Sequence, residues 1–160
     1  FAGLGGVPDV VVYNPSYRVR GTLVTLDPDE VHKSLDITAF GAFLVAQAAV
    51  RQMLPLKRGT ILFTGASAGV KGYAQSAPFA MGKFALRGLA QSMARELHPQ
   101  GIHIAHVVVD GGIRAEGRPD GGNDNTLDPD AIADSYLHLV DQPKNSWSWE
   151  IELRPWVETF

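Results

Sequence analysis

The chain has 160 residues, 45% of them hydrophobic, with a formal net charge of −3 and no cysteine. One hydrophobic core suits this length, so we expect a single domain over residues 1–160. The acidic balance argues against nucleic acid or an anionic membrane as a partner, the absence of cysteine excludes disulfides and cysteine-ligated metals, and no uninterrupted apolar run approaches the roughly 18 residues of a membrane span.

The amino-terminal part of the chain predicts a strand and a long helix. Residues 9–13 (DVVVY) form a nearly continuous apolar run before a turn at 14–16, as in a buried parallel strand. Asp27 provides an N-cap, followed by a proline at the first helical position and an acid three residues after the cap. We expect this helix to run to about Leu54, with a bend near residues 38–41.

The rest of the chain continues to alternate strands and helices. In order, we expect a strand at 60–64 (TILFT), a small-residue loop at 65–69 (GASAG), a helix from Ser76 or Ala77 to about 98–101, a strand at 102–109, a polar loop at 110–125 with five glycines, a helix from the Asp128 cap to about Val140, and a half-buried strand at 147–153. Four strands alternating with three helices predict an α/β fold with a parallel sheet.

The order of these motifs resembles the carboxyl-terminal part of the short-chain dehydrogenase/reductase (SDR) family, whose members transfer hydride between a nicotinamide cofactor and a carbonyl or alcohol. The matching segments are residues 8–16 (PDVVVYNPS) to the family's fourth strand and turn, 59–69 (GTILFTGASAG) to the strand before the catalytic serine, 79–83 (FAMGK) to the Tyr-x-x-x-Lys helix, and 101–113 (GIHIAHVVVDGGI) to the strand before a Pro-Gly turn. The resemblance implies a Rossmann-type parallel sheet with helices on both faces, of which this chain holds the second half.

The start of the chain departs from the family. The family's first three strands and its glycine-rich phosphate turn would precede residue 8. Residues 3–6 (GLGG) come before a strand, whereas a phosphate-binding loop follows a strand and opens a helix, so we expect an exposed lead-in there. The strand at 9–13 then becomes a sheet edge that should pair with another chain or aggregate. Phe1 replaces an initiator methionine and no signal peptide pattern follows, so we expect a cytoplasmic protein whose sequence starts inside a longer gene product.

The resemblance also implies a depleted catalytic set. Phe79 stands at the position of the family tyrosine, Thr38 at that of the asparagine and Ala66 at that of the serine. The family tyrosine donates or removes the proton, and the lysine binds the nicotinamide ribose and lowers the tyrosine pKa. Only Lys83 keeps its chemical type, and Phe79 has no ionisable group to replace the missing acid.

Two other side chains are candidate replacements in this catalytic set. Ser67 lies one residue beyond the serine position, and a small change in the loop would bring its hydroxyl to that place. Tyr73 lies in the loop before the helix, where it is either a second phenol for the site or an exposed lid aromatic. Lys83 shares a helical face with Phe79, and it serves either as a ribose ligand or as a partnered structural lysine.

The implied cofactor is NAD or NADP, held by Asn14, Lys83, Gly111 and Ile113. The loop at 111–127 would be flexible and would cover a small-molecule substrate. The helices at about 38–54 and 79–97 resemble the family's dimer interface, so we expect a homodimer or homotetramer. The strand at 147–153 is a further candidate contact.

The histidines of the third strand form no metal site in our interpretation. His106 and Asp110 share one face of a strand while His103 lies on the other, so the three do not converge as ligands. We therefore expect structural histidines and no metal. Two functions remain open: an SDR oxidoreductase with an atypical acid, or a catalytically inactive relative that keeps the fold for dimerisation or ligand binding.

Overall fold

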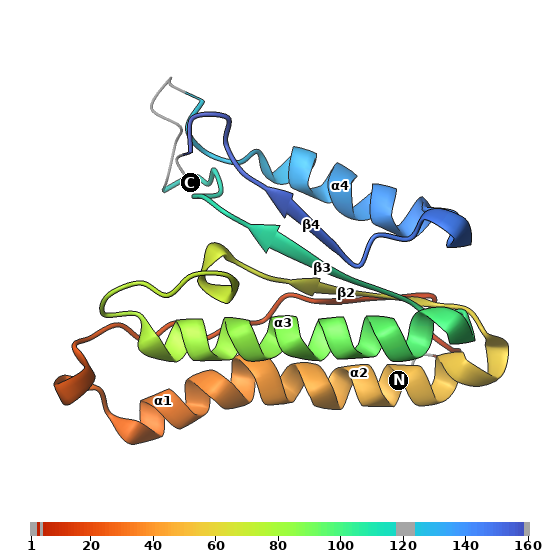
Figure 1. Ribbon diagram of the computed structural model, residues 1–160, viewed down its shortest axis with the longest axis horizontal. Coiled ribbons are helices and arrows are strands. Elements are labelled where there is room, and N and C mark those ends of the chain that lie inside the picture. Colours follow the sequence, from red (N-terminus) through yellow and green to blue (C-terminus); the bar gives the residue numbers. More distant parts are fainter. Residues whose placement is uncertain (1–2, 4, 118–123, 159–160) are drawn as a thin grey trace.

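The computed structural model describes residues 3, 5–117 and 124–158. Its centre is a parallel four-stranded sheet in the order β1-β2-β3-β4, so strands that follow one another in the chain lie side by side (Figure 1). The strands are β1 (Val10–Tyr13), β2 (Thr60–Thr64), β3 (His103–Val109) and β4 (Glu150–Leu153). The register pairs Val12 with Leu62, and Val107 with Ile151. All four strands therefore end on the same side of the molecule.

Helices cover both faces of this sheet. They are α1 (Pro28–Leu35), α2 (Gly41–Met53), α3 (Ala77–Leu97) and α4 (Pro129–Asp141). The first three lie on one face and α4 on the other (Figure 1). The larger core packs residues such as Ala46, Leu86 and Ile104 between α2, α3 and the sheet, and a smaller core around Leu62 and Leu139 lies under α4. The predicted Rossmann-type α/β architecture is confirmed.

The helix starts follow the expected chemistry. The side chains of Asp27 and Asp128 each accept a hydrogen bond, 2.9 Å long, from the backbone N–H two residues later, and a proline follows each cap. The helix α3 begins at the predicted residue but differs in its cap. Ser76 makes no capping bond, and its buried hydroxyl has no partner among the described residues.

The predicted bend of the first long helix is a π-helical turn at Asp36–Phe40, between α1 and α2. A π turn widens the helix and changes which backbone groups are available. The phenol of Tyr13 at the end of β1 donates to the carbonyl of Ile37 within this turn. The turn therefore attaches the helix to the first strand close to the carboxyl end of the sheet.

The last strand is shorter than predicted, since it covers Glu150–Leu153 and leaves Trp147 and Trp149 outside it. Trp147 lies instead after a 3-10 turn, where its ring stacks on His103 at 4.8 Å between centroids. The alternation of apolar and polar residues before β4 therefore comes from an aromatic cluster over the sheet end and not from a pleated strand.

The loop between β3 and α4 is anchored at both ends. Ile113 and Leu127 form a parallel bridge, and Arg114 pairs with the carboxylate of Asp128. Residues 118–123 of the predicted flexible loop lie outside the described residues. At the start of the chain, Gly3, Gly5 and Gly6 are exposed, as expected of a lead-in, and Leu4 is outside the described residues.

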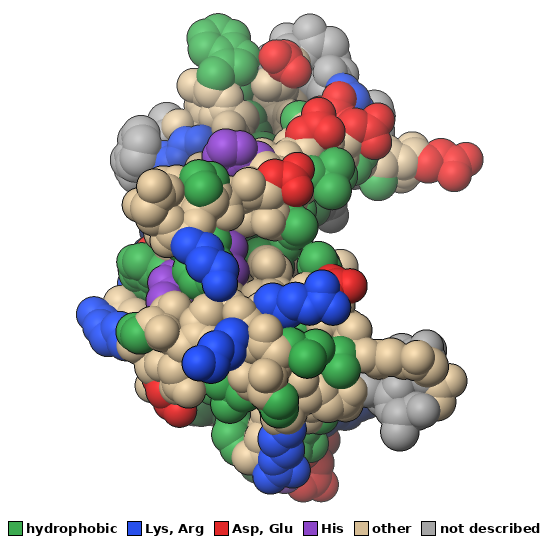
Figure 2. All heavy atoms as spheres, turned by 90° about the vertical axis from the view of Figure 1, so that its right-hand side faces the viewer, with side chains coloured by type: hydrophobic (Ala, Val, Ile, Leu, Met, Phe, Trp, Pro, Cys, Tyr) green, Lys and Arg blue, Asp and Glu red, His purple; other side chains and the backbone are tan. Residues whose placement is uncertain are grey.

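The strand β1 forms an open edge, as predicted. Val10 and Val12 are 41% and 49% exposed, and they border an apolar groove of about 520 Å³ whose far wall is α4. Figure 2 shows the molecule hollowed on this side, between the layer of α4 above and the layer of α2 below.

The continuous helical stretch Pro28–Leu56 bears on the expectation that the chain has no membrane span. It has 29 residues and a window with a mean hydropathy of 1.4, so it is long and apolar enough to cross a membrane by those two criteria. One face of it is buried in the core through Ala42, Ala46 and Met53. Core helices of globular proteins pass the same test, so this helix alone is weak evidence for a membrane.

Candidate active site

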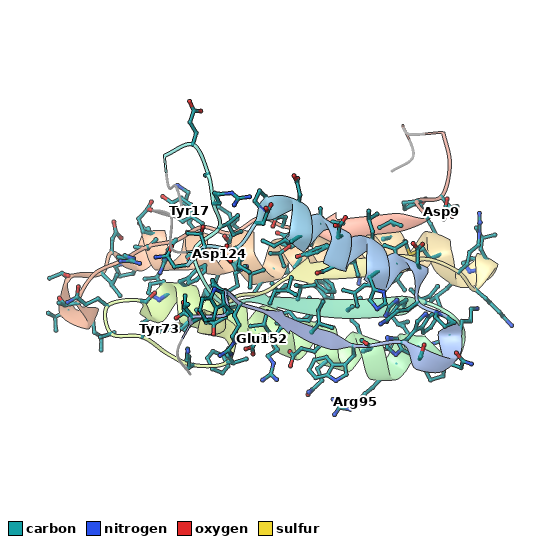
Figure 3. All side chains as sticks on the ribbon, turned by 90° about the horizontal axis from the view of Figure 1, so that it is seen from above. Asp9, Tyr17, Tyr73, Arg95, Asp124 and Glu152 are labelled. Atoms are coloured by element: carbon teal, nitrogen blue, oxygen red, sulfur yellow. The ribbon has the colours of Figure 1, made fainter. Side chains whose placement is uncertain are left out.

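The carboxyl ends of β1, β2 and β3 open onto a polar cavity of about 700 Å³. All the residues that the sequence named as catalytic or cofactor-binding line it, namely Asn14, Ser67, Tyr73, Phe79, Lys83, Gly111 and Ile113. In Figure 3, Tyr17 and Tyr73 lie toward this end of the molecule and Asp9 toward the other. Ligands of open parallel sheets bind outside the carboxyl ends of the strands, so the cavity is in the place expected of an active site.

Lys83 lies at the floor of the cavity. Its position in the first half of α3 directs it under the loop after β2, and only 3% of the residue is exposed. Its ammonium Nζ donates to the carbonyl oxygen of Thr64 at 2.6 Å. Burial lowers the pKa of Lys83 from 10.5 to about 8, because a charged amine is less stable away from water. Lys83 therefore has a backbone hydrogen-bond partner and also lines the cavity.

Phe79 lies one helical turn before Lys83, and its ring is placed between two cations. The Nζ of Lys83 is 5.7 Å from the ring centroid, and the guanidinium carbon of Arg18 is 4.9 Å from it. Both distances are in the range of a cation–π contact. Phe79 therefore lines the cavity with two cations beside its ring. Its side chain has no proton to transfer.

The family's asparagine and serine positions are held here by Thr38 and Ala66. Thr38 is buried in the π turn, where its hydroxyl accepts from the N–H of Tyr17 at 3.3 Å and its Cβ lies against Gly82 of α3. Ala66 precedes a short 3-10 turn that Ser67 opens. Ala66 and Ser67 are both half-buried and both line the cavity, and of the two only Ser67 carries a hydroxyl.

Tyr73 is 45% exposed at the cavity mouth, and the amine of Lys71 lies 5.7 Å from its ring centroid. Asn14 follows β1 and lines both this cavity and the apolar groove. Gly111 has a φ of +150°, which an L side chain rarely adopts, and a Cβ there would come within 2.7 Å of Pro155. The backbone after β3 therefore requires glycine at this point.

Asp110 replaces the proline of the family turn and is a charged group that the sequence did not assign to the site. It is buried, lines the cavity, and pairs with Lys71 at 3.8 Å and with Arg154 at 3.4 Å. Two cations therefore pair with this carboxylate on the wall of the cavity.

Behind Lys83 lies an ionic network that sequence reasoning missed. Arg87 donates two hydrogen bonds of 2.7 Å to the carboxylate of Glu150, and Nδ1 of the fully buried His106 lies 3.0 Å from the same carboxylate. Burial lowers the pKa of His106. Burial acts to raise the pKa of Glu150, but the hydrogen bonds from Arg87 and His106 hold it below its usual value. The spacing of Lys83 and Arg87, four residues apart on one helix face, was the available signal.

His103 and His106 lie on opposite faces of β3, as their spacing in the sequence predicted. His103 lies 2.9 Å from the carbonyl of Ser148 and stacks on Trp147, on the opposite face of β3 from His106. Within the described residues, no group of three or more histidine, aspartate or glutamate side chains is placed to hold a metal ion.

The comparisons with known proteins agree with this geometry. A family model described as short chain dehydrogenase matches residues 2–119. An uncharacterized oxidoreductase of Staphylococcus aureus (strain N315) is 27% identical over 154 residues, which are 94% of this chain and 65% of that protein. Human 17-beta-hydroxysteroid dehydrogenase type 1 is 34% identical over 100 residues, which are 62% of this chain and 30% of that protein.

Solved structures show the same fold. A short-chain dehydrogenase from Rhodopseudomonas palustris has 34% sequence identity and a TM-score of 0.80, covering 92% of this chain and 62% of that one. A metagenomic short-chain oxidoreductase in complex with NADP has 29% identity and a TM-score of 0.80, covering 96% and 64%. The chain thus spans less than two thirds of the length of both structures.

Proposed function

The chain belongs to the short-chain dehydrogenase family, and from this premise we propose that it acts as an NAD(P)-dependent oxidoreductase on a small carbonyl or alcohol substrate. The observation that carries the proposal is the buried Lys83, whose amine lies in a polar cavity at the carboxyl ends of the strands. A buried lysine without a carboxylate partner is unfavourable in a purely structural role, since the charge is poorly solvated.

The cavity fits the nicotinamide half of such a cofactor. Lys83 offers an ammonium and Asn14 an amide for the hydroxyl groups of a ribose. Gly111 and Ile113 also line the cavity, and the backbone at Gly111 has a φ of +150°. When bound, a nicotinamide cofactor supplies or accepts the hydride. Gly3, Gly5 and Gly6 precede β1, whereas a pyrophosphate-binding turn follows a strand and opens an α-helix, so these glycines do not fit such a turn.

The residues of this chain then position the substrate. Ser67 is proposed to donate its hydroxyl to the substrate oxygen, and Tyr73 to close over the cavity mouth. The loop at 111–127 is proposed to cover a small-molecule substrate, since its two ends are fixed beside the cavity by the Ile113–Leu127 bridge. The choice between NAD and NADP is left to experiment.

The proposal includes self-association and a cytoplasmic location. Exposed apolar side chains gather on α2, on the π turn before it and on α3: Phe40, Phe43, Leu44, Met81 and Phe84. Burying them in a homodimer, or in a homotetramer, would remove a large apolar area from water.

A second candidate is an inactive member of the family that binds a ligand or a partner subunit. The observation that favours it is Phe79, which places a ring without a hydroxyl at the family's acid.

Deuterium transfer separates the two candidates. NADH and NADPH carrying deuterium at C4 are incubated with the protein and a panel of small ketones and aldehydes, and the products are analysed by mass spectrometry. The proposed oxidoreductase gives an alcohol one mass unit heavier. If the cofactor binds saturably but no substrate in the panel gains deuterium, the inactive-relative candidate is favoured.

A further inference from the structure

We propose that Lys83 is itself the proton donor and acceptor of this site, in the place where Phe79 has no proton to give. The inference rests on the proposed function. It assigns a residue to the proton transfer that the family tyrosine performs and that Phe79 cannot. In reduction, the carbonyl carbon of the substrate receives the hydride, and its C=O π pair becomes the new O–H bond by taking a proton from the Lys83 ammonium. The neutral amine is then protonated again by water in the open cavity.

The geometry around the amine supports this role. Lys83 Nζ donates one hydrogen bond, to Thr64, which leaves two of the three N–H groups of an ammonium for the cavity. Its amine lies 5.7 Å from the ring centroid of Phe79, so the two side chains share the same part of the cavity. Within the described part of the chain, no carboxylate lies within ion-pair distance of it, so proton loss breaks no salt bridge.

Glu158 is an exposed carboxylate of the cavity lining, and several other acidic groups of the cavity and its surroundings have partners elsewhere. Asp110 forms ion pairs with Lys71 and Arg154. Tyr136 bonds the side chain of Thr64 at 2.7 Å on the α4 face, away from the Lys83 side of the sheet. Tyr13 donates to the π turn, and burial raises its pKa. Ser67 and Tyr73 line the cavity but have no base bonded to them among the described residues.

The charged neighbours of Lys83 shape its titration. From α3, β3 and β4 come Arg87, His106 and Glu150. The charged residues that line the cavity are Arg18, Arg20, Asp110 and Glu158, and Lys71 pairs with Asp110 beside it. Burial is the main cause of the lowered pKa of His106, and the nearby charge of Lys83 lowers it further. Burial, the main influence on Lys83, brings its pKa to about 8, where both the acid and the base form are available near neutral pH.

The first test measures proton affinity without turnover. The full chain is labelled with trace acetic anhydride over pH 6 to 11, and the labelling of each lysine is followed by peptide mass spectrometry. The internal references are the four other lysines, Lys33, Lys57, Lys71 and Lys144. Lys83 is expected to reach half-maximal reactivity near pH 8, corrected for its lower accessibility. A midpoint equal to that of the reference lysines overturns the proposal.

The second test follows proton transfer. Lys83→Arg keeps the positive charge and hydrogen bonds for a ribose, but a guanidinium does not release its proton. Its turnover in the deuterium assay is expected to fall by about 10²- to 10⁴-fold, with cofactor affinity changed far less. Lys83→Ala with added ethylamine should regain part of the rate, and Lys144→Met is the matched control. Circular dichroism confirms that each variant is folded, and turnover is measured at saturating cofactor.

The outcomes separate this inference from the proposed function. Wild-type deuterium transfer that survives Lys83→Arg with the same pH profile overturns the role of Lys83 and leaves the oxidoreductase standing. Absence of transfer by the wild-type protein with bound cofactor overturns both. A wild-type reduction rate that falls as pH rises through about 8, lost in the arginine variant and recovered with ethylamine, supports the inference.

Discussion

Replacing Lys83 with methionine is expected to make the folded chain more stable at neutral pH. The side chains have similar length, but methionine carries no charge into the buried position. The difference between a pKa of 10.5 and one of about 8 corresponds to roughly 3 kcal/mol of unfavourable charge burial at pH 7. The lost hydrogen bond to Thr64 offsets roughly 1–2 kcal/mol of that gain. We therefore expect Lys83→Met to raise the free energy of unfolding by about 1–2 kcal/mol at pH 7.

The pH dependence of this difference has a definite sign. Between pH 8 and 10.5 the unfolded chain keeps the Lys83 proton while the folded chain has released it, so wild-type stability rises with pH relative to the variant. The advantage of methionine should shrink by roughly 3 kcal/mol across this range and change sign. Tyrosine titrations occur in both proteins and cancel in the difference.

Urea unfolding at pH 7 and at pH 9.5, followed by circular dichroism, measures the effect. Lys144→Met, at an exposed lysine, is the matched control and should show no such trend with pH. A Lys83→Met chain that is less stable at pH 7, or a difference that does not vary with pH, would refute the view that Lys83 is a buried charge kept for function. Function held at the expense of stability is typical of active sites.

Three further substitutions test the surroundings of the site. Glu150→Gln should destabilise the chain by about 1–3 kcal/mol in urea, because Arg87 and His106 lose their anion, and the wild-type advantage should be present above pH 4.5 and fade as pH falls below it. Gly65→Ala should lower the melting temperature by several degrees, since the added Cβ would come within 2.3 Å of His106 and 2.9 Å of the carbonyl of Val107; an unchanged melting curve would contradict this packing. Phe79→Tyr should raise the rate of deuterium transfer and show, by ultraviolet titration, a phenol with a pKa below 10 because two cations flank the ring; a normal phenol titration would contradict that placement.

Much of the fold was predictable because its signals are local. Three signals depend only on neighbouring residues: the apolar run DVVVY, the Asp-Pro helix starts and Gly101 after the third helix. The corresponding elements begin or end within one or two residues of the expected bounds. The exception is Trp147, where alternation of residue types predicted a strand. Its ring is instead held by stacking on His103, a contact between residues 44 positions apart that periodicity does not contain.

The gathering of the candidate residues in one cavity was predictable from the sequence, but the electrostatics of that cavity were not. The family motifs brought Asn14, Phe79 and Lys83 to one cavity, because parallel strands end on the same side of the sheet. The pairing of Glu150 with Arg87 and His106 depends on the packing of α3 against β3 and β4, which the sequence does not state. The depth of burial of Lys83, which sets its pKa, likewise follows from the tertiary fold.

The most direct test of the oxidoreductase account is a titration of the purified 160-residue chain with NADH and NADPH, following cofactor fluorescence, with Lys83→Ala alongside and the oligomeric state checked on the same sample. The account predicts saturable binding of one of the two cofactors by a folded chain and a loss of affinity of at least tenfold in the variant. A folded wild-type chain that binds neither cofactor would contradict it.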